Sequence, residues 1–285
     1  MTMATPFYES DAAVEQYLLF HYGTPEQICP LLPEARTACG FPARCVSESL
    51  RRIGAPAGTR ALDLGCAVGR SSFELRRHFD EVLGVDFSAR FIAAADRMRE
   101  EWALTVRVPG ESGASEEMRL ELPAELSTDQ VRFERGDACA LRADLGAFDL
   151  VLMANLIDRL PDPARCLARM PELISPGGWL VLTSPYTWLE EYTPREKWLD
   201  GGGRGALSAL KERLEPAFEL RHVFDLPFLI REHRRKFQWS VAETSLWRRK
   251  GGPTNLSNPE GVLSTARHQM NDAAYQDAGG TATKP

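Results

Sequence analysis

A short apolar strand that leads into a glycine-containing turn constrains the fold of this chain more than any other feature. Residues 61–69 read Ala-Leu-Asp-Leu-Gly-Cys-Ala-Val-Gly, and a helical pattern follows from Arg70. Such a strand–turn–helix unit places a nucleotide-type ligand across the carboxyl end of a β-strand. Dinucleotide sites require Gly-x-Gly-x-x-Gly, and here Arg70 occupies the third glycine position. The spacing therefore argues against an NAD-type dinucleotide and in favour of another nucleotide-type ligand.

Apolar strand segments alternate with helical patterns along most of the chain. This alternation predicts a doubly wound, mostly parallel α/β sheet of seven strands, a Rossmann-like fold. The last two strands lie close together in the sequence, so we expect them to pair as an antiparallel hairpin at the sheet edge. The expected helices are 10–22, 42–53, 71–78, 88–102 and 163–174. The expected strands are 61–64, 81–87, 131–134, 148–154, 179–184, 219–230 and 236–247.

The spacing of these elements divides the chain into three parts. We expect residues 1–55 to form an N-terminal helical lid or cap, and residues 56–249 to form the domain that contains the sheet. Residues 250–285 are rich in Gly, Thr, Asn, Ala and Pro without periodicity, which predicts a disordered tail. The connection between the second and third expected strands is longer than one helix and two loops need, and residues 103–130 make up the surplus. Apolar and polar residues alternate there on both sides of 110–113, which predicts an inserted β-hairpin. The pattern leaves open whether this insertion covers the ligand site.

Charge and composition limit the partners of the chain. A net charge of −6 disfavours nucleic acid as a substrate. The sequence has no apolar run long enough to span a bilayer and no basic, apolar leader, so we expect no membrane contact and a cytoplasmic location. The six cysteines form no Cys-x-x-Cys pair and the five histidines have no helical metal spacing. We therefore expect reduced thiols and no metal.

The Asp-x-Gly-x-x-x-Gly form of the turn resembles motif I of class I S-adenosylmethionine-dependent methyltransferases. Asp86 and Asp137 end the next two strands, where carboxylates can accept from the ribose hydroxyls and from the adenine amino group. Asp63 would orient the loop or reach the cofactor's ammonium group. The resemblance implies that Asn155 faces the transferred methyl group, with a strand-end cap as the alternative. The expected cofactor-binding residues are Asp63, Gly65, Cys66, Gly69, Asp86, Phe87, Asp137, Ala138 and Asn155.

Longer segments resemble the methyltransferase domain of ovothiol synthase, a family also called 4-mercaptohistidine (5-thiohistidine) N1-methyltransferases. The resemblance runs over roughly residues 7–250 and implies methylation of the imidazole π nitrogen of 5-thiohistidine to give ovothiol A. The upstream iron-dependent sulfoxide synthase of that family carries a His-x-x-x-His-x-Glu run that these 285 residues lack. We therefore expect only the last step, with a separate sulfoxide synthase as a functional partner. The matching segments are 8–10, 16–23, 154–160, 183–194, 198–199, 226–233 and 235–243.

Transfer to an imidazole nitrogen requires one tautomer, so an acceptor must face the other ring nitrogen. A planar arginine fork suits the substrate's carboxylate, and a carboxylate such as Glu190 or Glu232 suits its ammonium. Aromatic rings can enclose the imidazole and exclude water. The expected catalytic residues are Asn155, Asp158, Glu191 and His233. The expected substrate-binding residues are Tyr17, Tyr22, Arg159, Tyr186, Trp188 and Arg231.

Each of these side chains also has an ordinary structural role open to it. Tyr186 and Trp188 fit core packing, Glu190 and Glu191 fit a solvated helix start, and 231–233 fits a hairpin turn. Two other functions stay open as well. The acceptor could be another histidine-like small molecule, or the chain could bind S-adenosylmethionine without catalysis, as a partner of a sulfoxide synthase.

Overall fold

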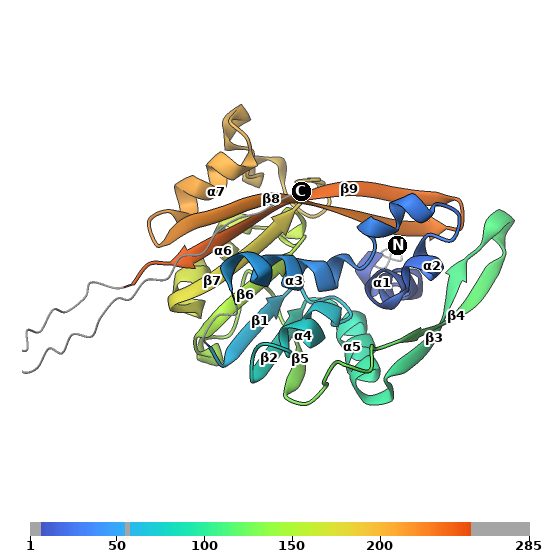
Figure 1. Cartoon of the computed structure of the whole chain (residues 1–285). Helices are drawn as coiled ribbons and strands as arrows, with labels where there is room; N and C mark the ends of the chain where they lie inside the picture. The colour runs from blue at the N-terminus through green and yellow to red at the C-terminus, as the bar shows by residue number, and fades with distance from the viewer. Residues whose placement is uncertain (1–6, 55–57, 252–285) are drawn as a thin grey trace, which may run out of the picture. The chain divides into compact units, whose positions relative to one another are not determined.

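The computed structural model describes residues 7–54 and 58–251 of the chain. Seven strands form one sheet in the order β5-β2-β1-β6-β7-β9-β8 (Figure 1). The first five strands in this order are parallel, and β9 is antiparallel to both β7 and β8. This order confirms the expected doubly wound fold and its edge hairpin. The strands are β1 (Arg60–Leu64), β2 (Glu81–Asp86), β5 (Val131–Arg135), β6 (Phe148–Ala154), β7 (Ile174–Ser184), β8 (Phe218–His233) and β9 (Lys236–Arg249).

Helices pack on both faces of the sheet and bury two apolar cores. Side chains alternate between the faces along each strand, so Leu150 and Leu152 of β6 lie in one core and Val151 and Met153 in the other. The first core includes residues of α1, α3, α4 and α5, and the second includes residues of α6 and α7 (Figure 1). The helices are α1 (Asp11–Tyr22), α2 (Pro25–Ile28), α3 (Phe41–Ile53), α4 (Arg70–Leu75), α5 (Ala89–Glu101), α6 (Pro163–Leu173) and α7 (Ala206–Leu214).

Three local differences separate the structure from the elements expected. Helix α4 ends at Leu75, so it is shorter than the expected 71–78. Strand β7 begins directly after α6, because Ile174 already pairs with Phe148. The Pro-Gly-Gly segment at 176–178 therefore lies within an irregular part of the strand, and does not separate helix from strand. Helix α7 was not expected, because it is short and follows a glycine-rich segment.

Two hairpins and the N-terminal helices gather near the carboxyl ends of the parallel strands. β3 (Ala103–Pro109) pairs with β4 (Ser115–Glu121), which confirms an inserted hairpin. It contacts α1, as β8 does. The β8–β9 hairpin runs on past the end of β7, since Ser184 pairs with Glu243 while the hairpin continues to His233 and Lys236. Figure 1 shows this hairpin end beside α1 and α2. These elements therefore border any site at the ends of the parallel strands.

The end segments of the chain bear on two of the expectations. Residues 252–285, which make up most of the expected tail, lie outside the described residues, as do 1–6 and 55–57. The division into cap, sheet domain and tail accordingly stays a prediction. Among the helices described, none combines the length and the apolar content that crossing a bilayer requires.

Candidate active site

The loop between β1 and α4 has backbone conformations that favour glycine. Gly65 and Gly69 have φ of 78° and 91°. The Gly65 N–H donates to the Val85 carbonyl at 2.7 Å, which holds the loop against β2. An added Cβ at Gly65 would lie 2.8 Å from the Leu156 side chain. At Gly69 it would lie 2.6 Å from the Phe133 ring. Both glycines are therefore required by the fold itself, in addition to any approach of a ligand to the backbone.

Asp63 of β1 is fully buried and anchors the start of α4. Its Oδ2 accepts hydrogen bonds from the Ser71 and Ser72 hydroxyls at 2.7 and 2.6 Å. Its Oδ1 has no partner among the residues described. Burial raises the pKa of Asp63 to about 6. Burial likewise raises the pKa of the neighbouring Cys66 thiol well above its ordinary value. One carboxylate oxygen thus fixes the loop, and the other is left for a cation or a water molecule.

Asp86 at the end of β2 links the glycine loop to α5. Its Oδ2 accepts from the Ala67 N–H and its Oδ1 from the Ser88 N–H, each at 2.9 Å. Burial raises the pKa of Asp86 to about 6. The next residue, Phe87, is 65% exposed, and the Arg135 guanidinium lies 5.6 Å from its ring centroid. An acid and an exposed aromatic ring therefore stand side by side at the end of β2.

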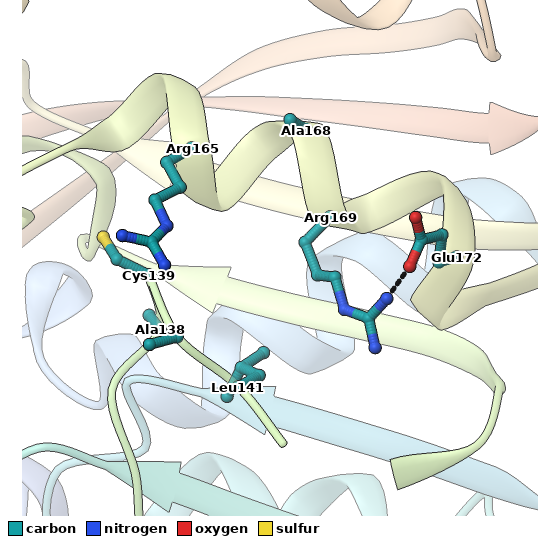
Figure 2. Close-up of a pocket in the computed structure, with 8 residues that line it drawn as sticks. Ala138, Cys139, Leu141, Arg165, Ala168, Arg169 and Glu172 are labelled. Atoms are coloured by element: carbon teal, nitrogen blue, oxygen red, sulfur yellow. Dashed lines mark ion pairs between the residues drawn. The ribbon is translucent and has the colours of Figure 1, made fainter. Parts of the chain in front are cut away.

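The turn after β5 carries the third strand-end acid. The Asp137 Oδ1 accepts from the Cys139 N–H at 2.8 Å, and Ala138 between them is buried. Behind this turn, a cavity of about 300 Å³ opens toward α6. Figure 2 shows Arg165 and Arg169 reaching from α6 into this cavity, with Arg169 paired to Glu172. The cavity includes Ala138 but no residue of the glycine loop, so it is separate from the loop.

The end of β6 places Asn155 and Asp158 beside the glycine loop. Asn155 has φ of 50°, and its Oδ1 accepts from the Thr183 hydroxyl at 2.9 Å. Asp158 is buried, and its Oδ2 accepts from the Thr187 N–H at 2.9 Å. The Asp158 Oδ1 lacks a partner in the described part of the chain. Burial raises the pKa of Asp158. Thr183 thus fixes the Asn155 side chain, and Asp158 keeps one acceptor free.

Arg159 is a cation held by its neighbours at the same edge. Its Nη1 donates to the Asp158 Oδ2 at 2.9 Å and to the Thr187 carbonyl at 2.6 Å. The guanidinium lies 5.6 Å from the Tyr192 ring centroid. Burial lowers the pKa of Arg159, but Asp158 and then Tyr8 raise it more, so the net shift is upward. The group stays charged and is able to bind an anion.

Helix α1 lies over the glycine loop. The Tyr22 hydroxyl donates to the Val68 carbonyl at 2.6 Å. Tyr17 packs on Phe91 with ring centroids 4.8 Å apart. Burial, followed by the Tyr8 hydroxyl, raises the pKa of Tyr17 well above its ordinary value. Between these tyrosines, His21 is buried and its Nδ1 has no partner in the described residues. Of the aromatic residues expected at the substrate, Tyr22 is therefore brought to the loop, and Tyr17 is brought to Phe91 of the neighbouring helix α5.

Three residues at this edge were not among the expected site residues. Tyr8 contacts the rings of Tyr17 and Tyr192 at centroid distances of 5.9 and 5.5 Å. His21 lies between Tyr17 and Tyr22, at ring distances of 6.0 and 6.2 Å. Tyr8 and His21 fall within the N-terminal segments, and Tyr192 within 183–194, whose sequence resembles the 5-thiohistidine family. That resemblance is the signal that could have found them.

Of three other expected residues, two have structural partners and the third is exposed. The Tyr186 hydroxyl donates to the Glu243 Oε1 at 2.7 Å. Trp188 stacks on Trp198 with ring centroids 6.1 Å apart. Glu191 is exposed. Core packing, the ordinary alternative for Trp188, is therefore what the structure favours, and an exposed Glu191 is poorly placed to select a tautomer.

The far end of the β8–β9 hairpin carries Arg231 and His233. Arg231 is buried, and it donates to the Gln27 carbonyl at 2.7 Å and pairs with Glu116 at 3.4 Å. It thus ties β8 to α2 and β4, and does not face solvent. His233 lies at the hairpin turn, where its Nδ1 accepts from the Arg235 N–H at 3.2 Å. Among the described residues, no hydrogen bond joins His233 to the glycine loop, and its expected role at the acceptor imidazole stays a prediction.

Buried polar atoms without a hydrogen-bond partner indicate which kind of ligand this edge suits. An unpaired buried polar atom costs about 1–3 kcal/mol. Seven side-chain atoms within the described ranges are of this kind, among them the Arg231 Nε. Three of the seven lie on elements around the glycine loop, namely His21 Nδ1, Asp63 Oδ1 and Asp158 Oδ1. A ligand with an ammonium group and hydroxyl donors would give them partners, which is the chemistry that S-adenosylmethionine offers. Within the same ranges, no cluster of three or more His, Cys, Asp or Glu side chains is placed to hold a metal ion.

Comparisons with known proteins identify relatives of the sequence. A family model described as a methyltransferase domain matches residues 40–235. A ubiquinone biosynthesis O-methyltransferase from Leptothrix cholodnii is 26% identical over 132 residues, which is 46% of this chain and 46% of that protein. A trans-aconitate 2-methyltransferase from Deinococcus radiodurans is 33% identical over 128 residues, 44% of this chain and 38% of that protein. The matches thus span less than half the length of these curated relatives.

A solved structure supports the fold. The N-methyltransferase NodS from Bradyrhizobium japonicum WM9, in complex with S-adenosyl-l-homocysteine, superimposes with a TM-score of 0.51. The sequences are 16% identical, and the superposition covers 86% of this chain and 99% of that one. At this identity the likeness concerns the fold alone, and it confirms the expected Rossmann-like architecture.

Proposed function

The chain belongs to the methyltransferase-domain family, and from this premise we propose that it transfers a methyl group from S-adenosylmethionine to the π nitrogen of 5-thiohistidine. One observation carries the proposal most. The buried Asp158 holds Arg159 at the end of β6, next to Asn155 and opposite the tyrosines of α1. A small acceptor with an amino-acid carboxylate fits this arrangement, because a guanidinium binds a carboxylate through two parallel donors.

The cofactor's parts match the strand-end residues in turn. We assign the ammonium to the free Oδ1 of Asp63, the ribose hydroxyls to Asp86 and the adenine amino group to Asp137. Phe87 offers an exposed ring to the adenine face. We also propose that residues 1–55 act as the cap over this edge, as the contact of Tyr22 with the glycine loop supports.

The residues of this chain have to position the acceptor and exclude water. When bound, S-adenosylmethionine supplies a methyl group that its sulfonium already activates. The acceptor nitrogen must be unprotonated, and the ring gains positive charge as its bond to carbon forms. Asp158 is the best placed of the expected acceptors, because its Oδ1 is free whereas Glu191 is exposed and the His233 Nδ1 already accepts from the Arg235 N–H. An ionised Asp158 would accept from the other ring nitrogen and stabilise the imidazolium.

A second candidate is methylation of another histidine-like acceptor. Arg159 recognises the part that all amino acids share, so the described contacts favour the amino-acid class more than they favour the thiol. A non-catalytic role beside a separate sulfoxide synthase is the remaining alternative.

One assay tests the proposal. The purified chain is incubated with S-adenosylmethionine and 5-thiohistidine, and the methyl position is located by mass spectrometry and NMR. We expect S-adenosylhomocysteine and one new methyl group on the π nitrogen. Turnover of histidine but not of 5-thiohistidine would favour the second candidate. Binding of S-adenosylhomocysteine without turnover of any imidazole would favour the non-catalytic role.

A further inference from the structure

We propose that Tyr8 is a substrate-positioning residue, which orients Arg159 toward the acceptor's carboxylate and forms, with Tyr17 and Tyr192, one wall of the acceptor site. The inference rests on the proposed function, because it assumes an acceptor that carries a carboxylate. It adds a residue that lies before the part of the chain that the family model matches.

Tyr8 reaches the site on a short segment that is tied to the cofactor-binding edge. The Ser88 hydroxyl donates to the Tyr8 carbonyl at 2.8 Å, and the Ala89 N–H donates to the Glu9 Oε1 at 3.0 Å. The Ser88 N–H itself donates to Asp86 at 2.9 Å. Hydrogen bonds therefore connect the acid assigned to the ribose with the segment that carries Tyr8. This segment is held at a fixed place relative to the cofactor.

Aromatic packing fixes the direction of the Tyr8 ring. Its centroid lies 5.9 Å from that of Tyr17, 5.8 Å from that of Phe91 and 5.5 Å from that of Tyr192. The Arg159 guanidinium lies over the same Tyr192 ring, 5.6 Å from its centroid, so Tyr8 and Arg159 share this neighbour, and Tyr8 is close enough to raise the pKa of both Arg159 and Tyr17. Since the Tyr8 ring has neighbours on three sides, its hydroxyl cannot turn away from Arg159 without unpacking them.

Arg159 has donors left for a ligand. Its three hydrogen bonds to oxygens of Asp158 and Thr187 all use Nη1. The guanidinium lies over the Tyr192 ring. Tyr8, on the N-terminal segment, packs against the same ring and raises the pKa of Arg159. A carboxylate needs two N–H groups pointing in parallel, so its affinity depends on how the guanidinium plane is held. Asp158 holds one end of this plane, and we assign the other end to Tyr8, which lies against the Tyr192 ring as Arg159 does.

The test removes the Tyr8 hydroxyl and keeps its ring. Tyr8→Phe, Arg159→Lys and the double variant are compared with the wild type on 5-thiohistidine and on its decarboxylated analogue. Trp239→Phe, an aromatic change at an exposed position of β9, is the matched control. Calorimetry with S-adenosylhomocysteine checks that each variant still binds the cofactor product.

The expected results separate positioning from a merely structural role. In Tyr8→Phe, KM for 5-thiohistidine should rise about tenfold, the loss expected for one hydrogen bond to a charged group. The value of kcat, and the KM for the decarboxylated analogue, should stay within about twofold, since neither depends on the carboxylate clamp. The double variant should be no worse than Arg159→Lys, because both changes act on one group.

Equal losses on both acceptors, or an unchanged KM for 5-thiohistidine in Tyr8→Phe, would overturn the inference while leaving the proposed function in place. If the wild type methylates a different carboxylate-bearing acceptor, the proposed substrate is wrong, and the same comparison with that acceptor and its decarboxylated form decides on Tyr8. If the wild type methylates no acceptor at all, both the proposed function and this inference fail.

Discussion

The Tyr22 hydroxyl donates a 2.6 Å hydrogen bond to the Val68 carbonyl, which joins helix α1 to the glycine loop. Both residues are buried. The carbonyl belongs to the turn whose glycines define the ligand edge, so the N-terminal helix and the cofactor loop are packed as one unit. The proposed cap is therefore tied to the proposed site, and we expect changes in α1 to affect ligand binding.

Removal of this bond gives the first prediction. Tyr22→Phe keeps the ring but leaves the Val68 carbonyl without its donor, which should lower the free energy of unfolding by about 1 kcal/mol. The affinity for S-adenosylhomocysteine should fall severalfold, because the loop is held less firmly. Urea denaturation and calorimetry measure the two effects. A variant with wild-type stability and affinity would show that α1 packs on the loop without supporting it.

The second prediction concerns Asp86. Asp86→Ala removes the acceptor of the Ala67 and Ser88 N–H groups as well as the proposed ribose ligand. Affinity for S-adenosylhomocysteine should fall by about a hundredfold, as expected for two hydrogen bonds to a carboxylate. Asp86→Asn retains one acceptor and should lose less. Calorimetry that finds unchanged affinity in both variants would contradict the ribose assignment.

The third prediction is a pH dependence of cofactor binding. The folded-state pKa of Asp63 and of Asp86 is about 6, above the ordinary value of 3.8, because both are buried. Such groups stabilise the unliganded fold below their unfolded pKa, and this contribution is lost as the pH rises through about 6. Binding of the ammonium and the ribose needs the ionised acids, so affinity should fall as the pH drops below about 6, by up to tenfold per unit for each acid. Calorimetry on both sides of about pH 6, with a ligand that does not itself titrate there, measures the affinity. An affinity that does not change with pH would contradict the assignment of Asp63 to the ammonium and Asp86 to the ribose.

The sequence predicted the sheet and its ligand edge because both depend on local patterns. An apolar strand followed by an acid is visible in one dimension, and β1, β2, β5 and β6 all end where expected, within one residue. The substrate side was harder, because it forms from long-range contacts. Tyr8 meets Tyr192 only through the packing of the N-terminal segment. The role of Arg231 could not be predicted for the same reason, because its partners Gln27 and Glu116 are far away in the sequence.

The fourth prediction separates two roles for Arg231. If it ties β8 to α2 and β4, Arg231→Met should lower the free energy of unfolding by about 1–2 kcal/mol, because it removes a buried hydrogen bond to the Gln27 carbonyl and a partly exposed ion pair with Glu116. The KM for the amino-acid acceptor should then change little in the variant that remains folded. Glu116→Gln, which keeps the shape of the partner, should have a smaller effect on stability. An increase in KM without loss of stability would instead support Arg231 as the carboxylate clamp.

The last prediction concerns His21, whose burial, followed by the Arg70 guanidinium, lowers its pKa to about 3. An unfolded chain binds a proton at this residue near its ordinary value of 6.5, and the folded chain does not, so acid favours unfolding. The contribution of His21 is complete above that value and decreases as the pH falls toward 3. At about pH 5 it should cost the wild type roughly 2 kcal/mol relative to neutral pH.

His21→Gln cannot take up this proton, so it should lose less stability between neutral pH and about pH 5 than the wild type does. Asp63 and Asp86 change stability in the opposite direction, but they do so in both proteins, so the difference between the two urea-denaturation series isolates His21. If the wild type and His21→Gln lose the same stability between neutral pH and about pH 5, His21 is not buried and neutral. In that case its unpartnered Nδ1 could not be counted among the atoms that a ligand satisfies at this edge.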